Sequence, residues 1–186
     1  TKQFYFPDTN VLITRFLTEE GVGEIQDFMP VDASAARAGD EGRHRLIRRV
    51  VCVRGTMAFS ARIAPRFGYG ALPHKARTST NGVLFESSEL ALSLTSSMPL
   101  DCDGMDASAQ FTLTQGESAV FALDHIDGAD APYTCPLGEA EKHFTETVAF
   151  WRAWLRQSRY RGRWREMVHR SALTLKLLTY APTGAM

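Results

Sequence analysis

Acidic side chains gather in two short segments, and carboxylates at close spacing are the first candidates for binding a metal ion. The segments DCDGMD and DHIDGAD contribute Asp101, Asp103, Asp106, Asp124, Asp127 and Asp130. Neither segment follows the order of a calcium loop, which alternates its ligands before a glycine and adds a distal glutamate. Aspartate and glycine are also the usual residues of turns. We therefore predict polar turns between strands and no metal site.

The histidines and the glycine-rich stretches give no catalytic motif either. The histidines are His44, His74, His125, His143 and His169. Their spacing lacks the H-E-x-x-H pattern of a zinc helix, and the chain has no G-x-S-x-G, Walker or G-x-G-x-x-G motif. Gly68-Tyr69-Gly70 is too short for a dinucleotide fingerprint. We predict no catalytic residue and no cofactor in this chain.

Aromatic side chains form a third cluster with two possible roles. The members are Phe150, Trp151, Trp154, Tyr160 and Trp164. Sugar rings stack on aromatic faces, so a carbohydrate contact is one interpretation. Helical spacing favours the other, in which Trp151 and Trp154 clamp a helix against neighbouring structure.

The elements that position these residues fall into two parts with different hydrophobic periods. From Gln3 to about His125 the period is two, which is typical of strands with one buried face. The predicted strands are 11–18, 23–30, 48–56, 57–67, 81–87, 89–97, 107–115 and 117–125. The first two form a hairpin around Glu19-Glu20-Gly21, with Gly21 supplying the positive φ of the turn. The segment 32–41 is predicted to be a loop. This pattern predicts a mainly β fold, an antiparallel β-sandwich.

After Ala131 the period becomes 3.6 residues, which predicts two helices. Pro136 suits the first turn of a helix that runs to about Arg159, with one apolar face. Its predicted face comprises Ala140, Phe144, Val148, Trp151 and Leu155. A second helix follows Gly162 and ends near Tyr180, before Pro182. Its predicted stripe comprises Trp164, Met167, Val168, Ser171, Ala172, Leu175 and Leu178. We expect a sandwich at 1–131, a helical linker at 132–161, and a further helix and loop at 162–186.

Composition excludes several other classes. The chain is 44% hydrophobic and 23% charged, as in ordinary globular proteins. No apolar run approaches the roughly 20 residues that cross a bilayer, so we expect no membrane contact. Its three cysteines (Cys52, Cys102 and Cys135) form no C-x-x-C pair, which favours a reducing, cytoplasmic location.

The charge is distributed unevenly although the whole chain is neutral. Residues 150–176 hold eight Arg or Lys against the single acid Glu166, a net charge of +7 balanced by −7 elsewhere. Such a segment suits nucleic acid or an acidic partner domain. No nucleic-acid-binding module surrounds it, so we expect no nucleic-acid partner.

Several stretches resemble one known family of enzymes. PDTNVLITRFLTEEGVGEIQDFMPV (7–31), RIAPRFGYG (62–70), FWRAWL (150–155) and RWREMVHRSALTLKLLTYAPTGA (163–185) resemble the amino-terminal part of bacterial glycoside hydrolase family 15, the trehalase and glucoamylase group. The run from Arg170 to Ala185 is the most specific of them.

This resemblance implies an architecture and a division of labour. It implies a sandwich of two extensive sheets (a super-sandwich), a helical linker, and the first helix of an incomplete α/α barrel. In the family the barrel performs inverting hydrolysis of α-glucosidic bonds with two carboxylic acids. No residue here corresponds to either acid. Pro182, Thr183 and Gly184 would begin a loop that leads to the rim of the substrate site.

We therefore expect a non-catalytic amino-terminal region of a longer enzyme that acts on an α-glucoside. Its implied partner is the catalytic barrel of the same polypeptide. Met167, Leu175 and Leu178 would lack cover without that barrel, so a homodimer through the second helix, or its folding back on the sandwich, is also expected. The alternative is an independent carbohydrate-binding sandwich, with exposed aromatic side chains on a concave strand face.

Overall fold

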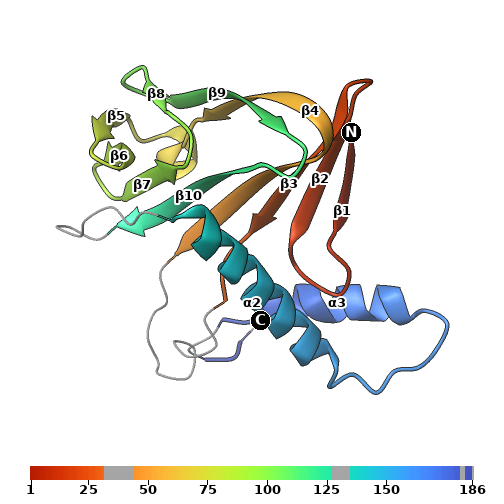
Figure 1. The fold of residues 1–186 in the computed structure, drawn as a ribbon. Coiled ribbons are helices and arrows are strands. Elements are labelled where there is room, and N and C mark those ends of the chain that lie inside the picture. The colour runs from red at the N-terminus through yellow and green to blue at the C-terminus, as the bar shows by residue number, and fades with distance from the viewer. Residues whose placement is uncertain (32–43, 127–134, 181–182, 186) are drawn as a thin grey trace.

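The computed structural model describes residues 1–31, 44–126, 135–180 and 183–185. It contains ten strands, a short 3₁₀ turn η1 and two helices in these ranges (Figure 1). The strands are β1 (Lys2–Tyr5), β2 (Leu12–Leu17), β3 (Gly21–Phe28), β4 (Arg45–Ile63), β5 (His74–Ser79), β6 (Gly82–Ser87), β7 (Ala91–Ser96), β8 (Asp101–Cys102), β9 (Ala107–Thr114) and β10 (Ser118–Ile126). η1 spans Phe67–Gly70, and the helices are α2 (Leu137–Leu155) and α3 (Arg165–Leu178). The fold is mainly antiparallel β, as predicted.

Strand β4 joins two sheets and corrects one prediction. The larger sheet has the order β1-β2-β3-β4-β10-β7-β6-β5, and β9 pairs with both β4 and the short β8. The sequence predicted separate strands at 48–56 and 57–67, but β4 is continuous over 19 residues. Gly55, with a φ of 68°, lies at the junction of its two halves. The chain therefore changes pairing partners without making a turn: residues 45–55 pair with β3 and β10, and residues 56–63 pair with β9.

The predicted hairpin of β2 and β3 is confirmed, but the role expected of its glycine is wrong. Leu17 pairs with Val22 across the turn, and Gly21 already lies in β3. Gly21 does not have a positive φ. A Cβ at this position would lie 2.6 Å from the carbonyl oxygen of Arg54, so glycine is needed there for close approach to β4.

The remaining predicted strands are confirmed as β6, β7, β9 and β10. The predicted alternation in the second half of β4 is confirmed too, because Met57 and Phe59 face the core while Ser60 is exposed. Strands β1, β5 and β8 were not predicted. The first is exposed along its whole length and the last has two residues, so neither carries a clear apolar period. The predicted loop at 32–41 lies outside the described residues.

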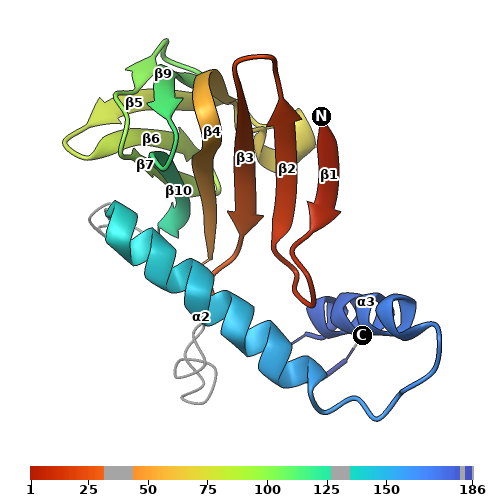
Figure 2. The ribbon, with the colours of Figure 1, turned by 45° about the vertical axis from the view of Figure 1, so that its right-hand side comes forward.

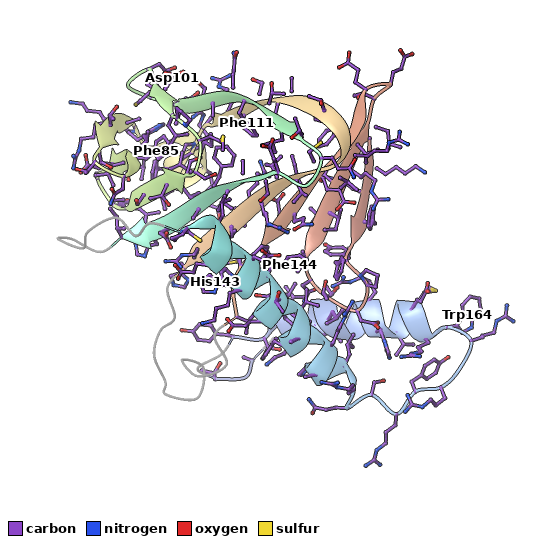
Figure 3. The ribbon with its side chains drawn as sticks, in the orientation of Figure 1. Phe85, Asp101, Phe111, His143, Phe144 and Trp164 are labelled. Atoms are coloured by element: carbon purple, nitrogen blue, oxygen red, sulfur yellow. The ribbon has the colours of Figure 1, made fainter. Side chains whose placement is uncertain are left out.

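Two apolar clusters lie on opposite faces of the larger sheet. The cluster between the sheets includes Phe85 and Phe111, both labelled in Figure 3. The second cluster lies between the sheet and α2 and includes Ile47, Val120 and Phe144. Strand β10 contributes to both clusters, which explains its nearly continuous apolar run, VFAL.

Helix α2 closes the second cluster, as its predicted face requires. Ala140 and Val148 are buried in this cluster, and Phe144 makes edge-to-face contacts with Phe6 and Phe28. The rest of the predicted face, Trp151 and Leu155, is buried in a third cluster with Leu173. Pro136 is the N-cap residue, and the helix ends at Leu155, four residues before the predicted end. Figure 2 shows α2 crossing beneath the lower ends of β3, β4 and β10.

Helix α3 lies beyond α2, next to the turn between β1 and β2 (Figure 2). Within the described ranges, neither helix is long and apolar enough to span a membrane. The domain limits at 131 and 161 stay a prediction.

Candidate interaction surface

The outward face of α3 carries the largest exposed apolar side chains on either helix. Met167 is 66% exposed and Leu178 is 64% exposed. Trp164 and Leu175 are also exposed on this side. Figure 3 shows Trp164 projecting from the end of α3, away from the sandwich. These four residues, at i, i+3, i+11 and i+14, share one side of the helix, which we call the α3 face. Leu177 is exposed too, but it comes four residues after the buried Leu173 and lies on the attached side.

Shallow grooves run along this helix. One is lined by Trp164, Met167, Val168 and Ser171. The next is lined by Glu166, Met167, Arg170, Ser171, Thr174 and Leu175. An open apolar groove on a helix is the usual receptor for the side chains of a second helix. The arrangement is suited to helix packing rather than to enclosing a small ligand.

Helix α3 is attached to the turn between β1 and β2, which we call the 5–10 turn. The guanidinium of Arg170 donates hydrogen bonds to the carbonyl oxygen of Thr9 (2.8 Å) and to Oδ1 of Asn10. It also lies 3.9 Å from the centre of the Tyr5 ring. Asn10 donates in turn to the carbonyl oxygen of Leu173 (3.3 Å). Burial lowers the pKa of the Arg170 guanidinium from its ordinary value.

A second pair of contacts holds the same turn. Nδ1 of the buried His169 lies 3.3 Å from Oδ1 of Asp8. Arg152 of α2 donates to the carbonyl oxygen of Pro7 at 3.4 and 3.5 Å. Helices α2 and α3 therefore both bind one turn of the sandwich. Arg152 and Arg170, two of the basic residues of segment 150–176, make these contacts.

An apolar cluster completes the attachment on the inner side of α3. Leu173 is buried with Trp151 and Leu155 of α2. Most residues of the stripe predicted for the second helix are exposed, among them Met167, Leu175 and Leu178, which were expected to lack cover. The buried positions are His169 and Leu173 instead. Three of the five aromatic residues follow the packing interpretation, because Trp151 is buried and Phe150 and Trp154 pack against its cluster, while Tyr160 and Trp164 are exposed.

The predicted rim residues lie just past α3. The amide of Gly184 donates to the carbonyl oxygen of Tyr180 (2.8 Å), and the amide of Tyr180 donates to the carbonyl oxygen of Ala185 (2.7 Å). Thr183 and Gly184 are exposed, and Gly184 has a φ of 70°. Pro182 lies outside the described residues. A substrate rim at these positions stays a prediction.

The acidic segments have structural partners. The buried carboxylate of Asp106 accepts hydrogen bonds from Arg62 (2.6 Å) and Arg66 (3.1 Å). Asp103 accepts from the amides of Met105 and Asp106, which lowers the pKa of its carboxyl group. Asp124 forms a buried ion pair with Arg45. Asp127 and Asp130 lie outside the described residues, and no metal-binding group occurs in the ranges that are described.

Two structural features were not predicted from the sequence. One is the 5–10 turn, whose residues Asp8, Thr9 and Asn10 were quoted only as part of a resemblance. A polar D-T-N tripeptide between strands is ordinary turn chemistry, so nothing marked it as a helix receptor. The other is Tyr69, which has a φ of 58° and is fully exposed.

Comparison with known proteins gives several relatives and no match to a family model. The chain is 33% identical over 159 residues to a trehalase of Mycolicibacterium smegmatis, covering 78% of this chain and 23% of the trehalase. It is 30% identical over 155 residues to a trehalase of Mycobacterium tuberculosis, covering 78% and 22%. A trehalase of Thermoplasma volcanium is 26% identical over 189 residues, covering 99% of this chain and 29% of that protein.

Among solved structures, a putative kojibiose phosphorylase from the human microbiome has a TM-score of 0.42 and 6% identity, covering 89% of this chain and 23% of that one. The chain is thus similar in sequence to trehalases at modest identity. It spans about a quarter of the length of the trehalases it matches.

Proposed function

We propose that this chain is the non-catalytic amino-terminal β-sandwich region of an inverting α-glucoside hydrolase, of the trehalase or glucoamylase type in glycoside hydrolase family 15. The observation that carries the proposal is sequence similarity to trehalases along 78–99% of the chain. The same alignments cover less than a third of those enzymes. A cytoplasmic location remains part of the proposal.

The α3 face is the second support. An exposed apolar surface of this kind, on a helix whose other face is buried, marks a site for packing against protein. We assign its occupant as the catalytic barrel of the same polypeptide, whose helices would cover Met167, Leu175 and Leu178. The length of the trehalases beyond the aligned portion provides ample chain for such a domain. On this assignment α3 is the first helix of the barrel, and Thr183 and Gly184 lead toward its substrate rim.

The chemistry of the described residues agrees with a supporting role. Inverting hydrolysis needs two carboxyl groups about 6.5–9.5 Å apart, one protonated and one free to activate water. The buried carboxylates, Asp106 and Asp124, are instead paired with arginines. These arginine partners are suited to fixing strands together, and Arg66 and Arg62 lower the pKa of the Asp106 carboxyl group.

Activity assays test the division of labour. The full-length protein should release glucose from trehalose or maltose, and the 186-residue chain should release none. Turnover by the isolated chain would overturn the non-catalytic assignment. A full-length protein that is inactive on every α-glucoside would overturn the proposed enzyme class.

Paired substitutions test the assignment of the α3 face. Leu178→Ser should destabilise the full-length protein by about 1–3 kcal/mol, because the side chain is buried against the barrel there. Leu17→Ser is the matched control, since Leu17 (57%) and Leu178 (64%) are similarly exposed in this chain. Equal effects of the two substitutions in the full-length protein would contradict the assignment. Sedimentation of the 186-residue chain separates the alternative occupant: a dimer abolished by Leu178→Ser means that a second copy covers this face.

A further inference from the structure

The segment that joins α2 to α3 concentrates positive charge at the surface. Residues 156–165 include five arginines and no acidic residue, and all five arginines are exposed. We call these five residues the basic connector: Arg156, Arg159, Arg161, Arg163 and Arg165. Figure 2 shows this segment beyond the strands of the sandwich, at the lower right.

The arginines of the sandwich, in contrast, are mostly paired with acids. Seven of them form ion pairs with a carboxylate: Arg15, Arg45, Arg48, Arg49, Arg62, Arg66 and Arg77. Among the described residues, no carboxylate pairs with the basic connector. Arg161 donates to the carbonyl oxygen of Ser158 (3.5 Å), and the guanidinium of Arg163 lies 4.5 Å from the centre of the Trp164 ring. The connector therefore keeps its charge uncompensated in this chain.

The position of these charges also works against the stability of α3. A helix N-terminus is the positive end of the helix dipole, so cations close to it are unfavourable. Helix α3 begins at Arg165, and its N-cap residue, Trp164, makes no side-chain capping hydrogen bond. Glu166 is the one acidic residue in the first turn, and five like charges within ten residues repel one another. The stability of the isolated chain thus does not explain the connector.

The basic connector adjoins the α3 face. Trp164 belongs to that face, Arg163 lies over its ring, and Arg165 follows it directly. Protein interfaces have an apolar centre and a polar rim, and arginine is enriched in them. The exposed apolar side chains and the unpaired arginines therefore match the two parts of one interface.

We infer that the basic connector binds an acidic protein surface, carried by the catalytic barrel that we assign to the α3 face. The inference rests on the proposed function for its partner and adds the chemistry of the contact. A guanidinium binds a carboxylate through two parallel hydrogen bonds, which favours acidic residues on the facing surface. Nucleic acid would also satisfy the charge, but interfaces with nucleic acid are more polar than those between proteins. The neighbouring apolar face therefore favours a protein partner.

Hydrogen exchange of the full-length protein, measured by mass spectrometry on peptides from residues 156–178, tests the inference. Arg161→Glu combined with Arg163→Glu should speed exchange of the α3 amides about tenfold at low salt, because the reversed charges repel the facing carboxylates. In the 186-residue chain the same double variant should leave exchange equal or slower, since acidic residues near a helix N-terminus are favourable. The two forms of the protein should thus respond differently to one change.

Three controls separate charge from other effects. Lys2→Glu combined with Arg54→Glu is the matched variant, because both residues are exposed and lack an ion pair within the described part of the chain. It should change α3 exchange by less than about twofold. Arg161→Lys combined with Arg163→Lys keeps the charge and should retain most of the protection. At about 0.5 M NaCl the wild-type protein and the glutamate variant should converge, because salt screens the contact.

Several results would overturn the inference. Equal exchange in the wild-type protein and the glutamate variant, while Leu178→Ser still destabilises the full-length protein, overturns it and leaves the proposed function intact. Faster exchange of the glutamate variant in the 186-residue chain overturns it too, because the charges then act within this chain. So does binding of single-stranded oligothymidine by the full-length protein that the glutamate variant abolishes, since the arginines are then open to a polyanion. If Leu178→Ser has no effect in the full-length protein, the proposed occupant itself is wrong.

Discussion

Helices α2 and α3 both have an apolar face, yet only one of these faces is covered. In α2, Val148, Trp151 and Leu155 are buried against the sandwich and against α3, and the opposite side is polar. In α3, Leu173 is buried, while Met167 and Leu178 project into solvent. The two helices differ in the number of neighbours that the described chain provides, rather than in their amphipathic character.

The comparison shows how to separate a residue's role in this chain from its role in a larger assembly. A buried residue stabilises the chain itself, and its loss is felt wherever the chain is studied. An exposed apolar residue on α3 contributes to stability only when another surface covers it. The predictions below follow from this contrast, beginning with the largest expected effect.

Substitution of two tryptophans, one buried on α2 and one exposed on the α3 face, tests this contrast most strongly. Trp151→Ala should lower the free energy of unfolding of the 186-residue chain by about 3–5 kcal/mol, because it opens a cavity in a buried cluster. Trp164→Ala should change it by less than about 0.5 kcal/mol, since the ring is over half exposed. Urea unfolding followed by circular dichroism measures both. Comparable losses would mean that the α3 face is already covered in solution.

The grip of α3 on the 5–10 turn gives a second, smaller effect. Arg170→Ala removes hydrogen bonds to Thr9 and Asn10 and should weaken docking of the helix by about 1–3 kcal/mol. Faster hydrogen exchange of the α3 amides would report it, with the exposed Arg165→Ala as the control. A double-mutant cycle with Asn10→Ala should give a coupling of about 0.5–3 kcal/mol. Additive effects would show that the Arg170–Asn10 hydrogen bond does not hold the helix.

Tyr69 extends the comparison to the sandwich. Its side chain is fully exposed, although it lies in a turn whose Phe67 is buried in the core. Tyr69→Gly should stabilise the chain by about 1 kcal/mol, since glycine adopts a left-handed conformation without strain. Thermal unfolding measures this, with Tyr160→Gly as an exposed tyrosine outside the turn. A loss of stability in Tyr69→Gly would contradict the strain assigned to the backbone at this position.

The smallest effect is a dependence on pH within the sandwich. Arg66 and Arg62 lower the pKa of Asp106 by donating to its carboxylate. A carboxyl group whose pKa is lowered on folding stabilises the folded state above its unfolded pKa, about 3.9, and this contribution is lost as the pH falls through the folded value. Asp106→Asn should therefore flatten the acid side of a stability profile measured from about pH 5 to pH 2. Asp101→Asn, on the same hairpin, is the control; an unchanged slope for Asp106→Asn would contradict the assignment.

Much of the fold could be predicted because its elements carry strong local periods. The alternation of Met57, Phe59, Ala61 and Ile63 is sufficient to place a strand and its buried face. The spacing of Ala140, Val148 and Trp151 does the same for α2. Where one strand ends and another begins is decided by pairing instead, so the continuity of β4 through Gly55 was not visible in the sequence.

The candidate surfaces were harder to predict for a physical reason. Which side of α3 is buried depends on where Leu173 meets α2 and where Arg170 meets the 5–10 turn, and both contacts join residues far apart in the chain. The apolar stripe identified the exposed face of α3. It did not identify the face that is buried against α2 and the 5–10 turn. Likewise, the strain at Tyr69 follows from its positive φ, which the identity of the residue does not predict.

The continuity of β4 also determines when the sandwich can assemble. The hairpins β2–β3 and β6–β7 join neighbouring segments and need only short loops to close. One edge of β4 pairs only with strands much later in the chain, since Val51 pairs with Ser118 and Thr56 with Thr114. Closing such long loops costs conformational entropy before any contact forms, so these pairings form slowly. Until β9 and β10 arrive, a 19-residue strand with apolar side chains has an unpaired edge, and this interval is when the nascent protein is most prone to aggregate.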